Sequence, residues 1–233
     1  MRAVLAAPPP TLLVIAKEPL PGRVKTRLTP VYRPEQAAAL AEAALADTLA
    51  TLSLIPAGRR LVVLDGRPGR WLPPGWEVAP QVTGGLDARL AAAFALAPPD
   101  RPALLVGMDT PQLTAATLAE PLSAARRPGV DAWYGPAADG GFWALGLARP
   151  TPGLARRLLV GVEMSTARTG AQLLARTVAA GLTVCHLPTL VDVDTAEDAE
   201  AVARAAPDGR FAARWRAFCP DRSAAPSERA ARR

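Results

Sequence analysis

The sequence predicts an α/β protein with one mostly parallel β-sheet that helices cover on both faces. Short apolar runs, such as residues 11–16 and 102–107, alternate along the chain with longer segments of helical periodicity. These runs are apolar throughout, which is typical of parallel strands that are buried on both faces. The chain has 233 residues and half of them are hydrophobic, so it can bury one substantial core, and we expect a single domain.

The elements can be assigned in chain order. Residues 11–16 form the first strand, and a basic, glycine-containing loop follows it and ends at residue 28. Pro34 suits the first turn of a helix, which apolar residues at helical spacing extend to residue 54. The sequence then predicts strands over 60–65, 76–81, 102–107, 131–135, 142–147, 181–187 and 190–193, and helices over 86–96 and 195–205.

These elements define one domain over residues 11–219, preceded by a short N-terminal extension, residues 1–10. Prolines interrupt the apolar stretch of this extension, so it resembles neither a signal peptide nor a membrane span. Residues 220–233 have no periodic apolar face, and we expect a disordered basic tail there. We expect a cytoplasmic protein whose two cysteines, Cys185 and Cys219, are reduced.

The net charge of +6 is concentrated in two segments. Residues 17–33 carry a net charge of +4 and residues 221–233 a net charge of +2, which together account for the whole excess. No basic helix face interleaved with aromatic residues remains to bind a phosphate backbone. We therefore expect neither a nucleic-acid nor a membrane partner, and no pattern in the sequence predicts an oligomeric state.

Both lysines of the chain, Lys17 and Lys25, lie in the basic loop after the first strand. An ammonium group is a compact point charge that fits between phosphate oxygens, whereas a guanidinium group is a planar fork. A glycine-containing, cationic loop after a strand is also where open α/β folds hold anionic ligands. We therefore predict that Lys17 and Lys25 bind phosphates. The alternative is a solvated basic surface loop.

Asp109 follows the apolar strand 102–107 almost directly. Its carboxylate is therefore expected at the carboxyl edge of the sheet, where open α/β folds bind ligands. Mg²⁺ prefers one or two protein carboxylates together with substrate phosphates, so Asp109 is a predicted metal ligand. The alternative is that Asp109 caps a helix over residues 112–120, although Thr114 is better placed for that role.

Asp192 and Asp194 flank Val193 in the last predicted strand. Side chains alternate along a strand, so only one of the two carboxylates is expected to join Asp109 at a metal site. We favour Asp192, with Asp194 as the alternative, because Asp194 leads into Thr195 and Asp198, which form a predicted capping box.

Two glycine pairs follow predicted strands. Asp139, Gly140 and Gly141 lie between two strands, and an ordinary hairpin turn explains them by itself. Glycines also allow the backbone to approach a ligand closely, and a carboxylate accepts hydrogen bonds from hydroxyl groups, so these three residues are predicted to bind an acceptor or a sugar. Gly84 and Gly85 precede a helix and offer backbone N–H groups to a base or phosphate.

Four segments in order carry a resemblance to a known family. They are AKEPLPGRVKTRL (16–28), GMDTPQL (107–113), GPAADGGF (135–142) and DVDTAED (192–198). Over residues 11–205 the chain resembles a glycosyltransferase-A-like (GT-A) family whose members are often described as glycosyltransferases, and it is similar to phospholactate guanylyltransferases.

The resemblance implies a nucleotide-diphospho-sugar transferase fold with a Rossmann-like sheet. It also implies that a nucleotide lies over the first loop and that a strand-end aspartate works with Mg²⁺ or Mn²⁺. In this sequence those positions fall on Lys17, Arg23, Lys25, Arg27 and Asp109. The chain departs from the family pattern in two places. Met108 replaces a small polar residue, and the GGLD segment 84–87 replaces the family's usual GDLG.

Three functions follow from these observations. The first is a Mg²⁺-dependent nucleotidyltransferase that joins a nucleoside triphosphate to a small phosphorylated or anionic acceptor and releases pyrophosphate, because the four cations of the first loop suit a triphosphate. In this function Lys17, Lys25 and Asp109 are the predicted catalytic residues. The second is a glycosyltransferase that uses a nucleoside diphosphate sugar. The third, a nucleotide-binding protein without turnover, is disfavoured by the carboxylates at strand ends.

Overall fold

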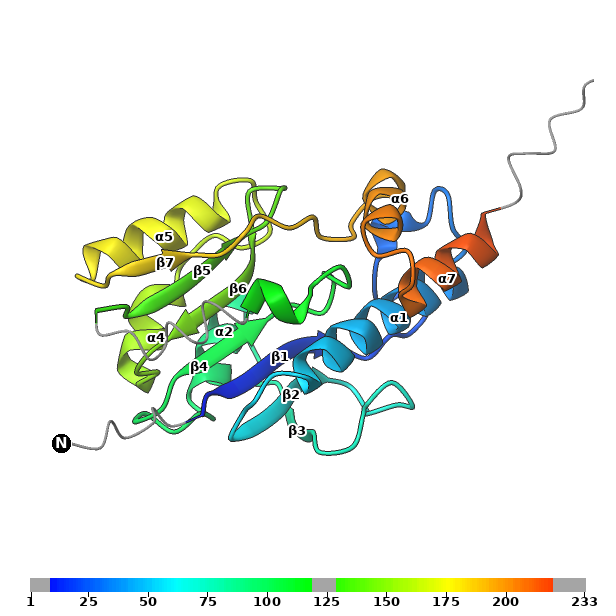
Figure 1. Cartoon of the computed structure of the whole chain (residues 1–233). Helices are drawn as coiled ribbons and strands as arrows, with labels where there is room; N and C mark the ends of the chain where they lie inside the picture. Colours follow the sequence, from blue (N-terminus) through cyan, green and yellow to red (C-terminus); the bar gives the residue numbers. More distant parts are fainter. Residues whose placement is uncertain (1–8, 119–128, 220–233) are drawn as a thin grey trace, which may run out of the picture.

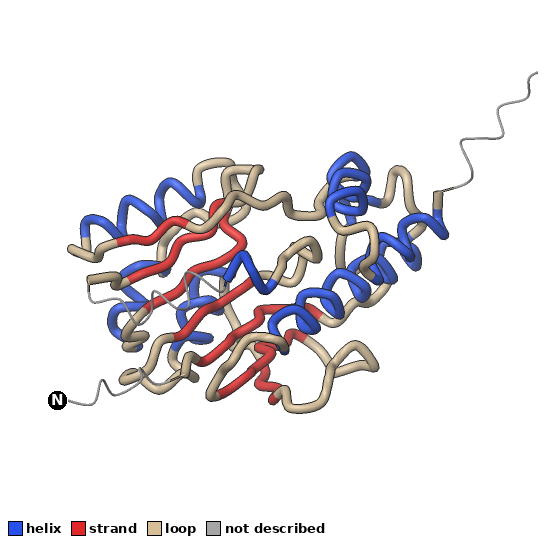
Figure 2. The backbone as a smooth tube through the Cα atoms, viewed as in Figure 1, coloured by secondary structure: helices blue, strands red, loops and turns tan. Residues whose placement is uncertain are grey.

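The computed structural model describes residues 9–118 and 129–219. Most of the expected N-terminal extension, the end of the helix considered over residues 112–120, and the predicted tail 220–233 lie outside the described residues. The described part contains one sheet of seven strands, in the order β3-β2-β1-β4-β6-β5-β7 (Figures 1 and 2). The strands are β1 (Thr11–Lys17), β2 (Arg59–Asp65), β3 (Glu77–Pro80), β4 (Ala103–Val106), β5 (Ala132–Pro136), β6 (Phe142–Leu147) and β7 (Val184–His186).

The sheet is mostly parallel, as the apolar runs predict. Only β6 runs antiparallel, and it pairs with both β4 and β5, whereas the other neighbouring pairs are parallel. Parallel strands place their carboxyl ends at one edge of the sheet, and an antiparallel strand begins at that same edge. The loops after β1 and β4 and the β5–β6 turn therefore lie at one edge, which sets the position of the site.

Helices cover both faces of this sheet (Figure 1). The described helices are α1 (Pro34–Ser53), α2 (Leu86–Phe94), α4 (Pro152–Leu159), α5 (Thr169–Ala179), α6 (Ala196–Ala205) and α7 (Arg210–Phe218), with a 3-10 turn η1 (Thr26–Leu28). Of these, α6 and α7 pack against α1 and not against the sheet. Leu45, Leu49 and Leu52 of α1 pack on one face, while α2, α4 and α5 bury side chains such as Phe94 and Leu173 on the other. Among the described helices, none is long and apolar enough to cross a membrane.

Three helices and one strand differ from the sequence expectation. The sequence analysis assigned no helix to α4, α5 or α7; α4, for example, buries Ala155, Leu158 and Leu159. The strand expected over 190–193 is wrong: Leu190 makes one isolated parallel bridge to Ala137, and the chain then leaves the sheet. Cys185 and Cys219 form no disulfide with one another in the structure.

The segment after Leu190 crosses the carboxyl edge of the sheet instead of extending it (Figures 1 and 2). The Val193 N–H donates to the Asp109 carbonyl over 3.1 Å, and the Gln112 side-chain amide donates to the Val191 carbonyl over 2.7 Å. These bonds hold the segment against the loop after β4. As a consequence, residues 192–194 lie beside Asp109 although more than eighty residues separate them in the chain.

Candidate active site

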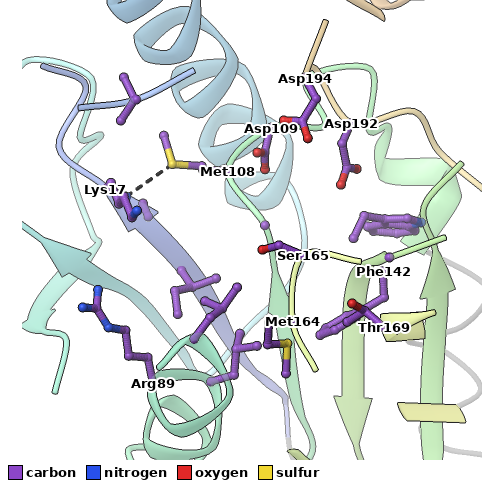
Figure 3. Close-up of a pocket in the computed structure, with 18 of the residues that line it drawn as sticks. Lys17, Arg89, Met108, Asp109, Phe142, Met164, Ser165, Thr169, Asp192 and Asp194 are labelled. Carbon is purple, nitrogen blue, oxygen red and sulfur yellow. Dashed lines mark hydrogen bonds between the residues drawn. The ribbon is translucent and has the colours of Figure 1, made fainter. Parts of the chain in front are cut away.

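A pocket of about 630 Å³ opens at the carboxyl edge of the sheet (Figure 3). The loop after β1, the loop after β4, the β5–β6 turn and the crossing segment 191–194 all contribute to its lining. Among the predicted site residues, those that line it are Lys17, Arg23, Lys25, Arg27, Gly84, Asp109, Asp139, Gly141, Asp192 and Asp194. Gly85 and Gly140 are not among its lining residues. The fold thus gathers into one cavity residues that lie up to 177 positions apart in the chain.

Lys25 forms the centre of an ion-pair cluster. Its Nζ donates to Asp109 Oδ2 over 2.5 Å and to Asp194 Oδ1 over 3.0 Å, and Arg27 reaches Asp194 Oδ2 over 3.2 Å. Only 9% of the Lys25 side chain is exposed, and its backbone is left-handed, with φ of 49°. Burial by itself lowers the pKa of Lys25, but Asp109 and Asp194 outweigh this effect and raise the pKa, so the ammonium stays charged.

The strand alternation that underlies the predicted choice between Asp192 and Asp194 is wrong. The two residues are not part of a strand, so their side chains do not alternate between opposite faces, and both line the pocket. The carboxylate that shares a cation with Asp109 is Asp194, not the favoured Asp192. The predicted capping box does form, because the Thr195 hydroxyl accepts from the Asp198 N–H and the Asp198 carboxylate accepts from the Thr195 N–H.

Asp192 has a different environment from its neighbours. Its Oδ1 is buried and has no hydrogen-bond partner among the described residues. Burial, followed by the nearby carboxylates of Asp109 and Asp139, raises the pKa of Asp192 to about 8, although Lys25 partly opposes the shift. A buried carboxylate oxygen without a partner is costly, so this atom needs a donor or a cation from a ligand.

The other predicted cations keep their side chains more accessible. Lys17 ends β1 at the pocket, and its backbone N–H donates to the Met108 sulfur over 3.3 Å (Figure 3). Arg23 lies 4.0 Å from Asp65 and its side chain is 61% exposed. Lys17 and Arg23 are therefore available to phosphates, whereas in this structure Lys25 contacts carboxylates.

The β3–α2 loop and helix α2 each contribute one residue that the sequence analysis missed, Gln81 and Arg89. Arg89 bonds Asp65 over 3.1 Å and the Gln81 side-chain oxygen over 3.2 Å, while the Gln81 amide donates to the carbonyls of Ala16 and Val63. Arg89 lies one helical turn after Gly85, the N-cap of α2. This spacing alone could have predicted that its side chain lies near the β3–α2 loop. The network fixes the loop against the ends of β1 and β2.

The β5–β6 turn and the loop before α5 form the opposite wall. Asp139 Oδ1 accepts the Gly141 N–H over 2.8 Å. Gly140 has φ of +88°, and a β-carbon there would collide with the Ala167 backbone, so packing by itself requires a glycine at this position. The sequence analysis also missed six lining residues on this wall, and as single positions most of them leave no periodic signal: Phe142, Trp143, Met164, Ser165, Thr166 and Thr169.

The donor set fits a divalent cation of the Mg²⁺ or Mn²⁺ type. Within residues 9–118 and 129–219 there is no group of three or more His, Cys, Asp or Glu side chains arranged to hold a metal ion. Two carboxylates, Asp109 and Asp194, nevertheless converge on one cation, the Lys25 ammonium. Mg²⁺ commonly uses one or two protein carboxylates and takes its other ligands from water and phosphate, so this pair suffices.

Comparison with known proteins supports the fold assignment. A family model described as "Uncharacterized protein conserved in bacteria (DUF2064)" matches residues 37–166. No curated protein matches the chain. A solved structure from Desulfovibrio desulfuricans G20, described as a candidate nucleotide-diphospho-sugar transferase, is 26% identical with a TM-score of 0.76, and the match covers 89% of this chain and 94% of that one.

Two further structures share the fold at lower identity. Rv0371c from Mycobacterium tuberculosis H37Rv, in complex with manganese, is 22% identical with a TM-score of 0.53, and the match covers 85% of this chain and all of that one. The 2-C-methyl-D-erythritol 4-phosphate cytidylyltransferase from Thermus thermophilus is 20% identical with a TM-score of 0.51, covering 85% and 98%. These likenesses confirm the nucleotide-diphospho-sugar transferase fold that the sequence motifs implied.

Proposed function

Because the chain belongs to the DUF2064 family of proteins conserved in bacteria and lines one pocket with both cations and carboxylates, we propose that it is a metal-dependent nucleotidyltransferase. It transfers a nucleotidyl group from a nucleoside triphosphate to a small acceptor and releases pyrophosphate. The observation that carries this proposal is the meeting of the basic β1 loop with Asp109 and Asp194 in one cavity.

The two sides of the cavity have separate roles in this reaction. The triphosphate lies along the β1 loop, where Lys17, Arg23 and Arg27 neutralise its charge. The base lies against the β3–α2 loop, where Gly84 leaves room for close approach and Gln81 is held in place by its bonds to Ala16 and Val63. The acceptor enters from the wall formed by the β5–β6 turn and α5.

Asp109 and Asp194 would hold a Mg²⁺ or Mn²⁺ ion, which when bound neutralises charge that develops on the phosphates. The same two carboxylates bind Lys25 in the structure described here, so Lys25 must release them when the ion is held. Its ammonium then turns to the phosphates, as the sequence analysis predicted for this residue. Lys25, together with Arg27 at Asp194, therefore balances the charge of the carboxylate pair and keeps the pair ordered until nucleotide and metal arrive together.

The protein contributes alignment more than covalent chemistry. An oxygen of the acceptor attacks the α-phosphorus and forms the new O–P bond, while the bond from that phosphorus to the oxygen that bridges to the β-phosphate breaks and pyrophosphate leaves. Holding the attacking oxygen in line with the leaving group converts a bimolecular step into an effectively unimolecular one.

Glycosyl transfer from a nucleoside diphosphate sugar is the second candidate. The protein from Desulfovibrio desulfuricans G20, whose description names a nucleotide-diphospho-sugar transferase, favours it at 26% identity. The same loop would then hold a diphosphate, and Asp139 would position the sugar.

The two candidates are separated by their leaving groups. The protein is incubated with Mg²⁺ or Mn²⁺, each nucleoside triphosphate and a panel of acceptors, and pyrophosphate is measured; in parallel, nucleoside diphosphate sugars are offered and nucleoside diphosphate is measured. We expect pyrophosphate release that depends on the acceptor and is lost in Asp109→Asn. The control is Glu77→Gln, which should keep this activity because Glu77 lies on β3 and pairs with Arg59 outside the pocket. Acceptor-dependent nucleoside diphosphate without pyrophosphate would establish glycosyl transfer instead, and nucleotide binding without either product would indicate a protein that does not turn over.

A further inference from the structure

The two walls of the pocket differ in charge. The wall formed by β1, its loop and α2 contributes the cationic side chains of Lys17, Arg23, Lys25, Arg27 and Arg89. The opposite wall, which we name the acceptor wall, consists of Asp139, Gly141, Phe142, Trp143, Met164, Ser165, Thr166, Thr169 and Asp192. Within the described lining, every charged side chain of the acceptor wall is a carboxylate.

These carboxylates have unused accepting capacity. Asp139 accepts the Gly141 N–H through Oδ1, and its Oδ2 makes no hydrogen bond with the described residues. Asp192 Oδ1 is buried and also lacks a partner among the described residues. A ligand that donates hydrogen bonds satisfies both oxygens, whereas a phosphate or carboxylate placed against Asp139 meets like charge.

Apolar and hydroxyl groups complete the acceptor wall. Phe142 and Met164 are partly buried and present apolar surface to the cavity, with Ser165 next to them (Figure 3). The Ser165 backbone is left-handed, with φ of 60°, and its hydroxyl bonds none of the described residues. The pattern of carboxylates, a hydroxyl and an apolar surface suits a molecule with several hydroxyl groups and a face of C–H groups.

The acceptor wall is ordered without a ligand. Asp87 Oδ2 accepts the Gly161 N–H over 2.8 Å, and Arg176 donates to the carbonyls of Val160 and Gly161. The Thr169 hydroxyl donates to the Glu163 carbonyl over 2.7 Å. These bonds hold both ends of the 160–169 loop, so its chemistry is presented to a ligand in a fixed arrangement.

We propose that the acceptor is a polyhydroxylated small molecule that carries no phosphate or carboxylate, such as a free sugar or cyclic polyol. Its hydroxyls donate to Asp139 and Asp192, and its C–H face packs on Phe142 and Met164. This inference rests on the proposed transfer reaction and replaces the phosphorylated or anionic acceptor that the sequence suggested. In the reaction an acceptor hydroxyl oxygen bonds to the α-phosphorus, its proton passes to solvent, and pyrophosphate leaves.

The test uses matched pairs of ligands and separates the inference from the proposed function. Binding of each nucleoside triphosphate with Mg²⁺ is first measured by calorimetry, because failure there would overturn the proposed function. Glucose, ribose, glycerol and myo-inositol are then compared with their phosphate esters by saturation-transfer NMR, with the nucleotide bound as its non-hydrolysable α,β-methylene analogue. We expect at least one free polyol to bind about tenfold more tightly than its phosphate ester. Tighter binding of the esters, or no binding by any free polyol, would overturn the inference.

Variants test the residues that carry this inference. Asp139→Asn keeps an oxygen for the Gly141 N–H, so the turn is retained while the charged acceptor is lost; we expect polyol binding to weaken by about tenfold and nucleotide binding to stay unchanged. The matched control is Glu163→Gln, a carboxylate beside Met164 that pairs with Arg168 and is absent from the described lining. Equal polyol affinity in wild type and Asp139→Asn would exclude this residue from the acceptor site.

Discussion

At the scale of single residues, Lys25 differs most from its sequence expectation. The sequence analysis predicted that Lys25 of the basic loop binds phosphates, and the structure shows its ammonium buried and bonded to Asp109 and Asp194. A substitution at Lys25 therefore acts on two functions. It removes the proposed phosphate contact, and it also removes the cation that the partly buried carboxylates of Asp109 and Asp194 share.

Lys25→Met tests whether the lysine competes with a metal ion. Removing the ammonium frees Asp109 and the Oδ1 atom of Asp194, whose Oδ2 atom keeps its contact with Arg27, and it raises the local negative charge. We therefore expect the nucleotide-free protein to bind Mn²⁺ at least about tenfold more tightly than wild type. Without Mn²⁺ the variant should unfold at a lower temperature, and saturating Mn²⁺ should recover much of that loss because the ion binds the folded state. Calorimetry and thermal unfolding measure the two effects.

Lys17→Met is the matched control for this prediction. Lys17 lines the same pocket and makes no ion pair with a described carboxylate. Its substitution should weaken nucleotide binding by about 1.5–3 kcal/mol and leave Mn²⁺ binding to the nucleotide-free protein unchanged. Equal Mn²⁺ affinity in wild type and Lys25→Met would show that the lysine does not occupy the metal position.

At the scale of elements, the acceptor wall depends on a contact between α2 and the turn after α4. Asp87 in the first turn of α2 accepts the Gly161 N–H over 2.8 Å. This bond, and next the Ala88 N–H, lowers the pKa of Asp87 below its ordinary value of 3.8. A carboxylate with a lowered pKa stabilises the fold above its unfolded pKa, and that contribution is lost as the pH falls through the folded pKa.

Asp87→Asn should therefore flatten the acid side of the stability profile. Between about pH 6 and pH 2.5, the unfolding temperature should fall further for wild type than for the variant, because the variant has no carboxylate to protonate at this position. The effect should be small and should decrease with salt, since the group is only partly buried. Asp100→Asn, at a surface carboxylate without hydrogen bonds to described residues, is the control. If the unfolding temperatures of wild type and Asp87→Asn fall in parallel with pH, the bond from Gly161 to Asp87 does not contribute pH-dependent stability.

At the scale of the whole molecule, the pocket places a basic wall opposite an acidic one. A triphosphate carries more negative charge than a nucleoside diphosphate sugar, so the basic wall should bind it more tightly. Screening weakens interactions of exposed charges, and the side chains of Arg23 and Arg27 are 61% and 67% exposed. We expect the preference for the triphosphate to shrink between about 0.05 M and 0.5 M salt, as measured by calorimetry with Mg²⁺. A preference for the diphosphate sugar at low salt would favour glycosyl transfer.

Much of the architecture follows from local patterns in the sequence. The apolar runs of β1, β2 and β4, the long helix α1 and the capping box at Thr195 were all expected, because each depends on burial or hydrogen bonds within a few residues. The strand-end position of Asp109 follows in the same way. Helices such as α4 and α5 were missed because their buried surface is a narrow stripe that only neighbouring elements define.

The sequence by itself determined the α/β sheet, the basic loop after its first strand, and the position of Asp109 at the end of another strand. Only the tertiary structure decided which of these groups meet. Lys25 bonds partners 84 and 169 positions away, and Asp192 and Asp194 reach one pocket because their segment leaves the sheet and bonds the loop after β4. Periodicity reports which face of an element is buried, but the distance between two charges depends on how the elements pack, and that distance determines their chemistry.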